Sequence, residues 1–532
     1  MMNGNAGVES KNSSAKAATL GFSAVFFTYF ITSFMTLGLS IASPMIAADL
    51  NGMSLFSWAI SLPALAMSFV ALLFGRLSDI YGRRNLLLTS LFFFTAGSVL
   101  GAVSQSFVIN IAARIINAFG LGAMAALCFS VIGDLYADPT ERSKWTGFLN
   151  IAGGISATCT QILVGMITDI LSWRYFFWVN VPVAIFCIIM VSVGVPKKNV
   201  HSENKIDYTG ALFLALASSA IILGFSFTDK HPWVSFHVSG LLIISIVFWY
   251  LFILTERRSS EPILDPLVFT NRTFLTAAAA AFLSFFGFIG ILNYFPLFLQ
   301  GIQGTGAKIS GLVLTPFSML LAFMGVPAGL LIAKTKRYKW IYILSYAVLT
   351  AAMFALTFFN SNTPLWLGVV VMIMGGLGVG AIPTVNILVV QFALPKRFMG
   401  ISVAAIFFIA NIATAVAPAI MGPAMNTTYE KRLATLLPQD IETQIGADAF
   451  KKFADPGVLM SKDSMAGLKE VFSKAQGQDP LLFENTVQSV RSALQSGLRV
   501  LFLIGFFALL LAFLIIVTIP EVPFDNGEKE TD

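Results

Sequence analysis

Long apolar stretches alternate with short polar ones over almost the whole length of the chain. Each stretch holds about twenty consecutive apolar residues, which is the length that an α-helix needs to cross the hydrocarbon core of a bilayer. An even number of such helices places both termini on the same side of the membrane. We expect fourteen helices, at residues 18–43, 55–75, 86–104, 107–131, 146–168, 175–195, 208–228, 236–255, 274–299, 309–333, 339–359, 365–388, 399–422 and 499–519.

The composition agrees with a protein that lies mostly in a bilayer. Apolar residues make up 57% of the 532 residues and charged residues only 11%, whereas soluble domains contain about 25% charged residues. The first apolar stretch is longer than the core of a signal peptide, so we expect it to be retained as a helix. The formal charge of +6 does not require a nucleic-acid partner, because the cytoplasmic loops of membrane proteins collect Lys and Arg.

Lys and Arg are distributed unequally between the two sets of loops. The loops on the side of the termini contain most of these residues, whereas the short loops on the opposite side contain Arg174, Lys230 and Lys308. Positive residues accumulate on the cytoplasmic side of membrane proteins. We therefore predict a multi-pass protein of the cytoplasmic (inner or plasma) membrane whose termini both lie in the cytoplasm.

Polar linkers divide the fourteen helices into groups of six, two and six. The seventh and eighth helices lie between two such linkers, as an inserted pair would. The longest polar segment is an outer loop at residues 426–495, which contains two helix-like stretches, Asp440–Phe453 and Met465–Ala475. Two interpretations of this loop stay equally open: a packed cap over the outer mouth, or a loosely ordered loop. The expected division is a cytoplasmic segment at 1–17, a six-helix bundle at 18–195, two inserted helices at 208–255, a second six-helix bundle at 274–519 that includes the outer loop 426–495, and a cytoplasmic tail at 520–532.

A charged stretch from Gly75 to Arg84 separates the second apolar run from the third. The flanking segments, from Leu50 to Gly75 and from Asn85 to Ala113, contain no Asp, Glu, Lys or Arg. The charged stretch is therefore predicted to form a tight cytoplasmic turn between two membrane helices. Its glycines permit close helix packing, and its cations are typical of the inner membrane interface.

Arg114 lies inside an apolar helix, about eight residues from its start. At 1.5 Å per residue this position is about 12 Å deep, close to the bilayer midplane. A charged side chain at that depth is costly and is by default a functional candidate. Asn117 lies three residues further on and shares the same helix face. The alternative is a structural tie between helices, in which Arg114 binds backbone carbonyl groups.

Polar side chains within other apolar helices suggest a substrate cavity. A polar side chain in a membrane helix more often binds a neighbouring helix than a ligand, so each one taken alone is also open to a structural interpretation. The sequence contains no phosphate-binding Gly-x-x-x-x-Gly-Lys-Ser/Thr loop and no His pair at ligand spacing, so we expect neither an ATP-driven pump nor an enzyme. The cavity candidates are Gln161, Asn293, Tyr294, Gln300, Asn386 and Asn411.

Several segments resemble, in order along the chain, those of one transporter family. Gly75-x-Leu77-x-Asp79-x-x-Gly82-Arg83-Arg84 resembles the loop signature of the major facilitator superfamily. The segments Asp134–Arg142 and Ser172–Pro182 resemble the loop after the fourth helix and the entry to the sixth. Leu292–Gln300 resembles the ninth helix of the fourteen-helix drug:proton antiporter branch, which is of the multidrug efflux type.

This resemblance implies roles for particular residues. In the family, the acid and the cations of the loop signature stabilise the outward-facing state, which implies a conformational latch here. Arg114 and Asn117 match an Arg-x-x-Gln pattern of the fourth helix that is tied to coupling or to substrate charge. Gly165 is the glycine that remains of a fifth-helix packing motif. The implied latch residues are Gly75, Asp79, Gly82, Arg83, Arg84, Asp134 and Arg142.

The resemblance implies an all-α integral membrane protein with the major facilitator fold. Such a protein is a secondary active transporter that works by alternating access, and this branch implies export of amphipathic organic compounds by proton antiport. We expect a small organic substrate, the lipid bilayer as surroundings, no bound cofactor or metal, no nucleic acid, and a monomer. The aromatic interior, nearly free of carboxylates, favours neutral or anionic compounds over strongly cationic drugs.

Two departures from the branch keep other functions open. Met35 stands where the first helix of the branch carries an acid, and Thr160-Gln161 stand where its fifth helix carries Gly-Pro. One alternative is a facilitator or importer of a metabolite or siderophore-like compound. Another is a membrane sensor or assembly protein that transports nothing and acts through its outer loop.

Overall fold

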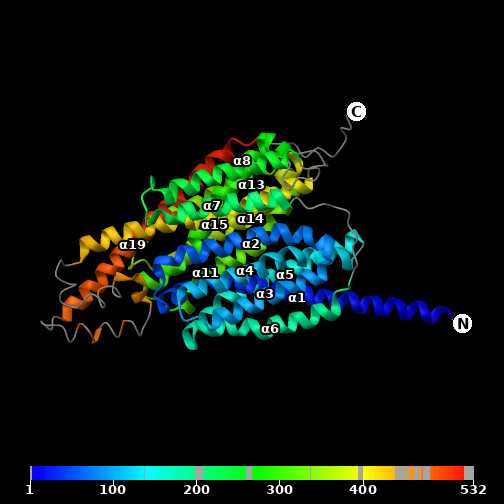
Figure 1. The fold of residues 1–532 in the computed structure, drawn as a ribbon, viewed down its shortest axis with the longest axis horizontal. Helices are drawn as coiled ribbons and strands as arrows, with labels where there is room; N and C mark the ends of the chain where they lie inside the picture. The colour runs from blue at the N-terminus through cyan, green and yellow to red at the C-terminus, as the bar shows by residue number, and fades with distance from the viewer. Residues whose placement is uncertain are drawn as a thin grey trace. The chain divides into compact units, whose positions relative to one another are not determined.

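The protein is described by a computed structural model in which the residues with a definite placement are almost entirely helical (Figure 1). Fourteen helices among them are long and apolar enough to cross a membrane. The predicted all-α class and the predicted number of spans are thereby confirmed. The described residues are 3–136, 138–197, 208–229, 231–258, 266–335, 337–393, 399–437, 450, 454–460, 465–466, 469–470, 472 and 480–520.

The helices group by their contacts into two compact units. Unit 1 comprises Met1–Ala42 and Leu62–Ile206, and unit 2 comprises Ser43–Ser61 and Asp207–Asp532. The tip of the hairpin between the first two helices thus belongs to unit 2, although the rest of both helices belongs to unit 1.

Six long helices begin in the N-terminal third of the chain. Within unit 1, α3 contacts both α4 and α6, and these three helices run side by side (Figure 1). Close approach of α3 to α4 depends on Gly97, because a Cβ atom there would lie 2.5 Å from the backbone nitrogen of Asn117. The helices are α1 (Asn3–Asp49), α2 (Phe56–Tyr81), α3 (Arg83–Ala102), α4 (Phe107–Leu135), α5 (Pro139–Ile170) and α6 (Trp173–Gly194), with a 3-10 turn, η1 (Met53–Leu55), before α2.

The remaining helices belong to unit 2. Within it α7 and α8 contact each other, and α7 also contacts α15. The helix that begins as α9 continues through two π turns, and the next one is interrupted at Met324. The elements are α7 (Tyr208–Ser226), η2 (Phe227–Asp229), η3 (Phe236–Gly240), α8 (Leu241–Glu256), η4 (Pro266–Thr270), α9 (Arg272–Ile289), η5 (Gly290–Tyr294), α10 (Phe295–Leu297), η6 (Phe298–Ile302), α11 (Ala307–Phe323), α12 (Gly325–Thr335), α13 (Lys339–Leu356), α14 (Leu365–Ala393), α15 (Met399–Leu436), η8 (Pro456–Leu459) and α19 (Pro480–Val517).

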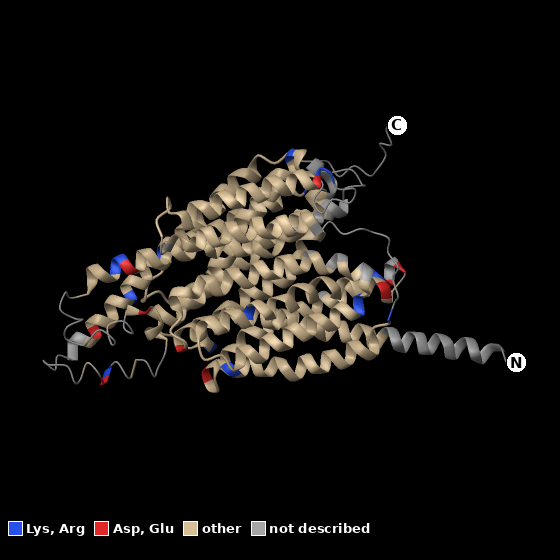
Figure 2. Ribbon diagram, viewed as in Figure 1, with Lys and Arg blue, Asp and Glu red and all other residues tan. Residues whose placement is uncertain are grey.

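Most charged side chains lie near the ends of the helices, and the helical stretches between them carry few (Figure 2), with Arg114 inside α4 as an exception. This distribution follows from the cost of placing a charge in hydrocarbon. It also explains why hydropathy locates the spans well. Hydropathy is less informative about where each helix ends, because a helix can continue beyond the bilayer.

The tight turn predicted at the charged stretch from Gly75 to Arg84 is shorter than expected, because the flanking helices extend beyond their predicted ends at residues 75 and 86. α2 continues through this stretch to Tyr81, and α3 begins at Arg83. The chain reverses at Gly82, whose φ of 83° lies in the left-handed region that glycine adopts without strain. Outside the hydrocarbon, polar side chains can be solvated while the backbone stays helical, so the turn is reduced to one residue.

The helices that flank the long outer loop are also longer than predicted. α15 continues to Leu436 rather than ending near residue 422, and α19 begins at Pro480 rather than near residue 499. The two helices contact each other, and apolar side chains such as Leu433 and Val490 are buried. Helix–helix packing therefore extends both elements beyond their apolar runs. The predicted helices Asp440–Phe453 and Met465–Ala475 fall largely outside the described residues.

Candidate functional site

Two arginines at the start of α3 connect it to α4 and α6 within unit 1. The guanidinium of Arg83 lies 3.0 Å from the Asp134 carboxylate, and it also donates to the carbonyl of Ser130. Arg84 donates to the carbonyl of Ser192 on α6. Both partners of the Arg83–Asp134 pair are partly exposed, at 25% and 26%. The structure thus joins three of the predicted latch residues to neighbouring helices.

The start of α5 lies against the end of α4. The Arg142 guanidinium packs over Gly133, where an added Cβ atom would lie 3.2 Å from it. The ring of Trp145 stacks on Tyr136 at 5.1 Å, and its Nε1 donates to Glu141 over 3.0 Å. Burial, and to a lesser degree the nearby Glu141 carboxylate, raise the pKa of Tyr136.

The other predicted latch residues lie on α2 or at its end. Gly82 forms the turn before α3. The backbones of Gly75 and Asp79 belong to α2, but their side chains lie outside the part of the chain that the structure describes. The predicted pairing of Asp79 with the cations therefore remains a prediction.

Arg114 and Asn117 both lie buried on α4, with 2% and 1% of their surface exposed. The Asn117 amide donates to the carbonyl of Phe94 over 2.8 Å and to the hydroxyl of Ser98 over 2.9 Å. It therefore ties α4 to α3, directly beside the close contact at Gly97. Asn117 thus makes the kind of tie between helices that was the alternative interpretation for Arg114.

Gln161 and Gly165 are buried one helical turn apart on α5. The preceding residue, Thr160, donates its hydroxyl within its own helix, to the carbonyl of Ser156. Met35 also lies in unit 1, where its sulfur accepts a weak hydrogen bond from the Asn180 amide at 3.7 Å. The two departures from the antiporter pattern are thus accommodated by local packing in the interior of unit 1.

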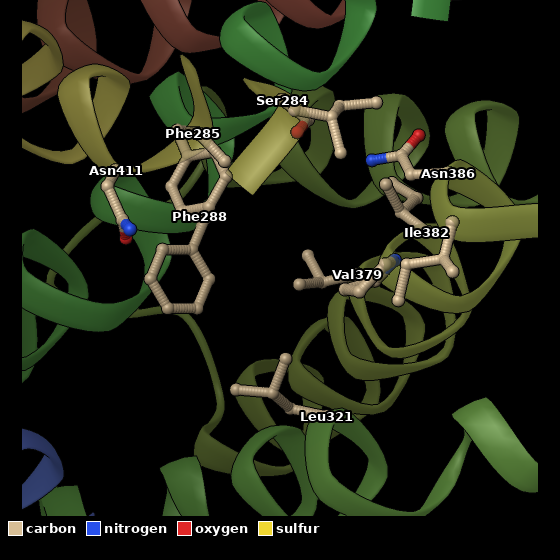
Figure 3. Close-up of a pocket in the computed structure, with 12 residues that line it drawn as sticks. Ser284, Phe285, Phe288, Leu321, Val379, Ile382, Asn386 and Asn411 are labelled. Atoms are coloured by element: carbon tan, nitrogen blue, oxygen red, sulfur yellow. The ribbon is translucent and has the colours of Figure 1, made fainter. Parts of the chain in front are cut away.

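A pocket of about 240 Å³ lies within unit 2, between α9, α11, α14 and α15 (Figure 3). Two of the six predicted cavity residues, Asn386 and Asn411, line it from opposite sides (Figure 3). None of the residues that line this pocket carries a charge. They are Ser284, Phe285, Phe288, Leu321, Val379, Ile382, Pro383, Asn386, Ile387, Ile406, Ala410 and Asn411.

Sequence analysis missed the tyrosine that holds Asn386 and the tyrosine next to it, neither of which lines the pocket itself. The hydroxyl of Tyr342 on α13 donates to the amide oxygen of Asn386 on α14. The Tyr342 ring packs edge to face against Tyr346, at 5.4 Å between centroids, and both rings are buried. The sequence did contain a sign of this pair: two tyrosines four residues apart in an apolar helix lie on the same helix face.

Of the other four cavity candidates, Gln161 lies on α5, and Asn293, Tyr294 and Gln300 lie along the π turns that follow α9; none of the four lines this pocket. The Tyr294 hydroxyl donates to Ser57 over 3.2 Å, and its ring packs against Phe56 at 5.5 Å. Asn293 is half-buried and Gln300 is buried at 3% exposure. Within unit 2, Tyr294 therefore connects the α9 continuation to the tip of the α1–α2 hairpin.

The described residues contain no group of three His, Cys, Asp or Glu side chains that could hold a metal ion. Fourteen helices among the described residues are long and apolar enough to cross a membrane, and the residues that line the pocket of unit 2 are uncharged. Comparison with known proteins identifies the family. The profile described as Major Facilitator Superfamily matches residues 25–418, and the chain belongs to this superfamily of secondary transporters, which are not enzymes.

Related proteins of known sequence include multidrug transporters. Multidrug resistance protein 3 of Bacillus subtilis (strain 168) is 27% identical over 416 residues, which are 77% of this chain and 80% of that protein. Multidrug transporter protein MdtP of the same organism is 25% identical over 492 residues, or 92% and 90% of the two chains.

A solved structure confirms the fold. The crystal structure of a bacterial homologue of the human lysosomal transporter Spinster, in an inward-facing and unoccupied conformation, gives a TM-score of 0.61 at 15% identity. The match covers 96% of this chain and 99% of the other. At this identity the likeness concerns the fold alone.

Proposed function

We propose that this transporter exports uncharged or anionic amphipathic organic compounds across the cytoplasmic membrane by proton antiport. The pocket in unit 2 is the observation that carries the proposal. Its lining combines the two phenylalanines of α9 with amides and a hydroxyl, and no lining residue is charged. Pockets that are mostly apolar, with a few polar groups to orient the ligand, are typical of small-molecule sites.

The relatives support the direction of transport. Two of them are named for multidrug resistance or multidrug transport, and others are named as an efflux transporter or an efflux pump. In this proposal the chain is a monomer of the fourteen-helix antiporter branch. Its helices form two bundles of six with an inserted pair, and both termini lie in the cytoplasm.

The charged cluster of unit 1, formed by Arg83, Asp134 and Arg142, is proposed to act as the conformational latch. Arg83 already bridges from α3 to Asp134 and Ser130 on α4, and Arg142 rests on the residue before Asp134. Ion pairs that are partly exposed contribute little to stability, so their presence at a helix junction favours a role in switching between states.

Arg114 is proposed to take part in coupling, and Asn117 to position the helix that carries it. Arginine keeps its charge at physiological pH, so Arg114 cannot itself release the proton. Its fixed charge inside the membrane can instead bias a neighbouring group or attract an anionic part of the substrate. The two hydrogen bonds of Asn117 hold α4 in place beside α3.

A flux experiment tests this proposal. Purified protein is reconstituted in liposomes, and movement of Nile red, a neutral aromatic dye, is followed with and without an imposed pH gradient. Proton antiport predicts net dye movement that follows the gradient and collapses with an uncoupler. Equilibration without regard to the gradient would indicate a facilitator, and no movement above protein-free liposomes would contradict transport of this class of compound.

Substrate charge is tested in cells. Cells that contain the protein should accumulate less Nile red than cells that lack it, while accumulation of the cation ethidium should change much less. Export of ethidium as efficient as that of Nile red would contradict the proposed preference for uncharged compounds.

A further inference from the structure

Asn386 is held in a single orientation by Tyr342. The tyrosine hydroxyl donates to the amide oxygen of Asn386, so this oxygen already has a partner on the side of α13. The amide nitrogen makes no hydrogen bond to any described residue. It lies on the side of the cavity, while the oxygen is turned away from it (Figure 3).

The surroundings make this nitrogen an isolated donor. Asn386 is 8% exposed and lines the pocket of unit 2. Phe288 lines the opposite side of the pocket and Val379 lines it from the same helix as Asn386, and both side chains are apolar (Figure 3). A ligand that fills the pocket displaces water from this amide N–H group, so a ligand that brings its own acceptor would be favoured there.

The other two polar residues of the pocket, Ser284 and Asn411, are placed differently from Asn386. The Ser284 hydroxyl donates to the carbonyl of Ala281 in its own helix, over 2.7 Å. The Asn411 amide lies on the opposite side of the pocket. No lining residue is a carboxylate that could bind a cation instead.

We infer that Asn386 is a specificity-determining residue that binds a carbonyl or similar hydrogen-bond acceptor on a flat, uncharged aromatic ligand, and that Tyr342 is its positioning residue. Tyr342 keeps the donor side of the amide toward the ligand by occupying the acceptor side. This inference rests on the proposed function only for the claim that such ligands are transported substrates. The binding itself can be tested separately.

Two ligands that differ by one group test the inference. 9-Fluorenone and fluorene share the same ring frame, but only fluorenone carries a carbonyl group. Their dissociation constants are measured with the full-length protein in detergent, and the ratio Kd(fluorene)/Kd(fluorenone) is compared between variants. One hydrogen bond corresponds to a change of roughly threefold to tenfold in this ratio.

Asn386→Leu should lower the ratio by about that factor while fluorene still binds. Tyr342→Phe should lower it too, because the freed amide can rotate its oxygen toward the ligand. Tyr338→Phe is the matched control: it removes a hydroxyl from the same helix that donates instead to the Pro520 carbonyl over 2.6 Å, so the ratio should not change. A purely structural effect would weaken both ligands equally and leave the ratio constant.

An unchanged ratio in both Asn386→Leu and Tyr342→Phe would overturn the inference. If Asn386→Leu fails to fold, Tyr342→Phe decides alone, because it keeps the aromatic ring in place. Failure of the proposed function gives a different result: the ratio then depends on Asn386 as described, yet Nile red is not exported. Export of Nile red together with an unchanged ratio would retain the function and reject the role of Asn386.

Discussion

Two asparagines inside membrane helices show how one side-chain type serves two purposes. The Asn117 amide donates two hydrogen bonds to α3 and thereby joins two helices. The Asn386 amide receives one hydrogen bond from Tyr342 and turns its donor to a pocket. The sequence alone could not distinguish these two roles, because the partners, Phe94 and Tyr342, lie 23 and 44 residues away along the chain. It could only mark both as polar groups in apolar surroundings.

Removing the Asn117 tie should destabilise unit 1. Asn117→Ala deletes two hydrogen bonds within the membrane, each worth about 0.6 kcal/mol on average, so we expect a loss of about 1 kcal/mol. Thermal unfolding in detergent, followed by circular dichroism, measures the effect. Asn85→Ala is the control, because Asn85 is exposed and donates only weakly, over 3.3 Å, to Tyr81. Equal melting temperatures for the two variants would contradict the structural role of Asn117.

The Arg83–Asp134 pair should matter more for transport than for stability. Both side chains are partly exposed, and pairs of this kind contribute about 0–1 kcal/mol to folding. Arg83→Gln and Asp134→Asn should therefore leave the melting temperature nearly unchanged while reducing gradient-driven Nile red flux severalfold. Lys144→Gln is the control, since its pair with Glu141 is long, at 3.9 Å, and highly exposed. If flux is normal in all three variants, this pair is not a latch.

At the scale of whole elements, the apolar runs located the helices but not their ends. The turn at Gly82 occupies one residue because a helix with polar side chains can continue outside the hydrocarbon. α15 and α19 extend well past their apolar cores because they pack against each other there. Apolar positions such as Tyr429 and Leu494 provide that packing at helical spacing. A window that averages hydropathy over about twenty residues cannot detect them among polar neighbours.

The short helix η8 should be held more firmly at acidic pH. It packs against the tip of the α1–α2 hairpin within unit 2, where Gly457 lies against Ala48 and Met53. The Asp455 carboxylate accepts the Gly457 N–H over 2.7 Å. Burial nevertheless raises the pKa of Asp455, and the backbone hydrogen bonds from Gly457 and Met53 offset this only in part.

The sign of the pH dependence follows from this raised pKa. The packed state favours the protonated carboxyl more than the free segment does. The stabilisation is therefore complete below the ordinary pKa of an aspartate and is lost as the pH rises through the raised value. Hydrogen exchange of residues 454–460, corrected for intrinsic rates, should show protection that decreases with pH in this range. Asp455→Asn should remove the dependence, whereas Asp138→Asn, at the start of α5, should not. Protection that increases with pH would contradict the assignment.

For the whole molecule, the properties predicted best are those that each segment carries by itself. The number of spans depends on local composition, so the fourteen spans and the fold class followed from the sequence. The pocket is built from α9, α11, α14 and α15 together. Its lining residues Ser284 and Ile406 are more than a hundred residues apart along the chain. Only the assembled unit shows that Asn386 and Asn411 share a cavity while Asn293 and Gln300 do not line it.

The orientation of the whole molecule in the membrane is tested by labelling from one side. An even number of spans and the clustering of Lys and Arg on one side predict that the loop at Lys308 faces outward and that the tail after Pro520 faces the cytoplasm. In a background in which the exposed Cys159 is replaced by serine, Lys308→Cys should react with a membrane-impermeant maleimide in intact cells. Glu528→Cys should react only after the membrane is opened. Labelling of Glu528→Cys in intact cells would place the tail outside and reverse the assignment of the charged cluster at Arg83 to the cytoplasmic face.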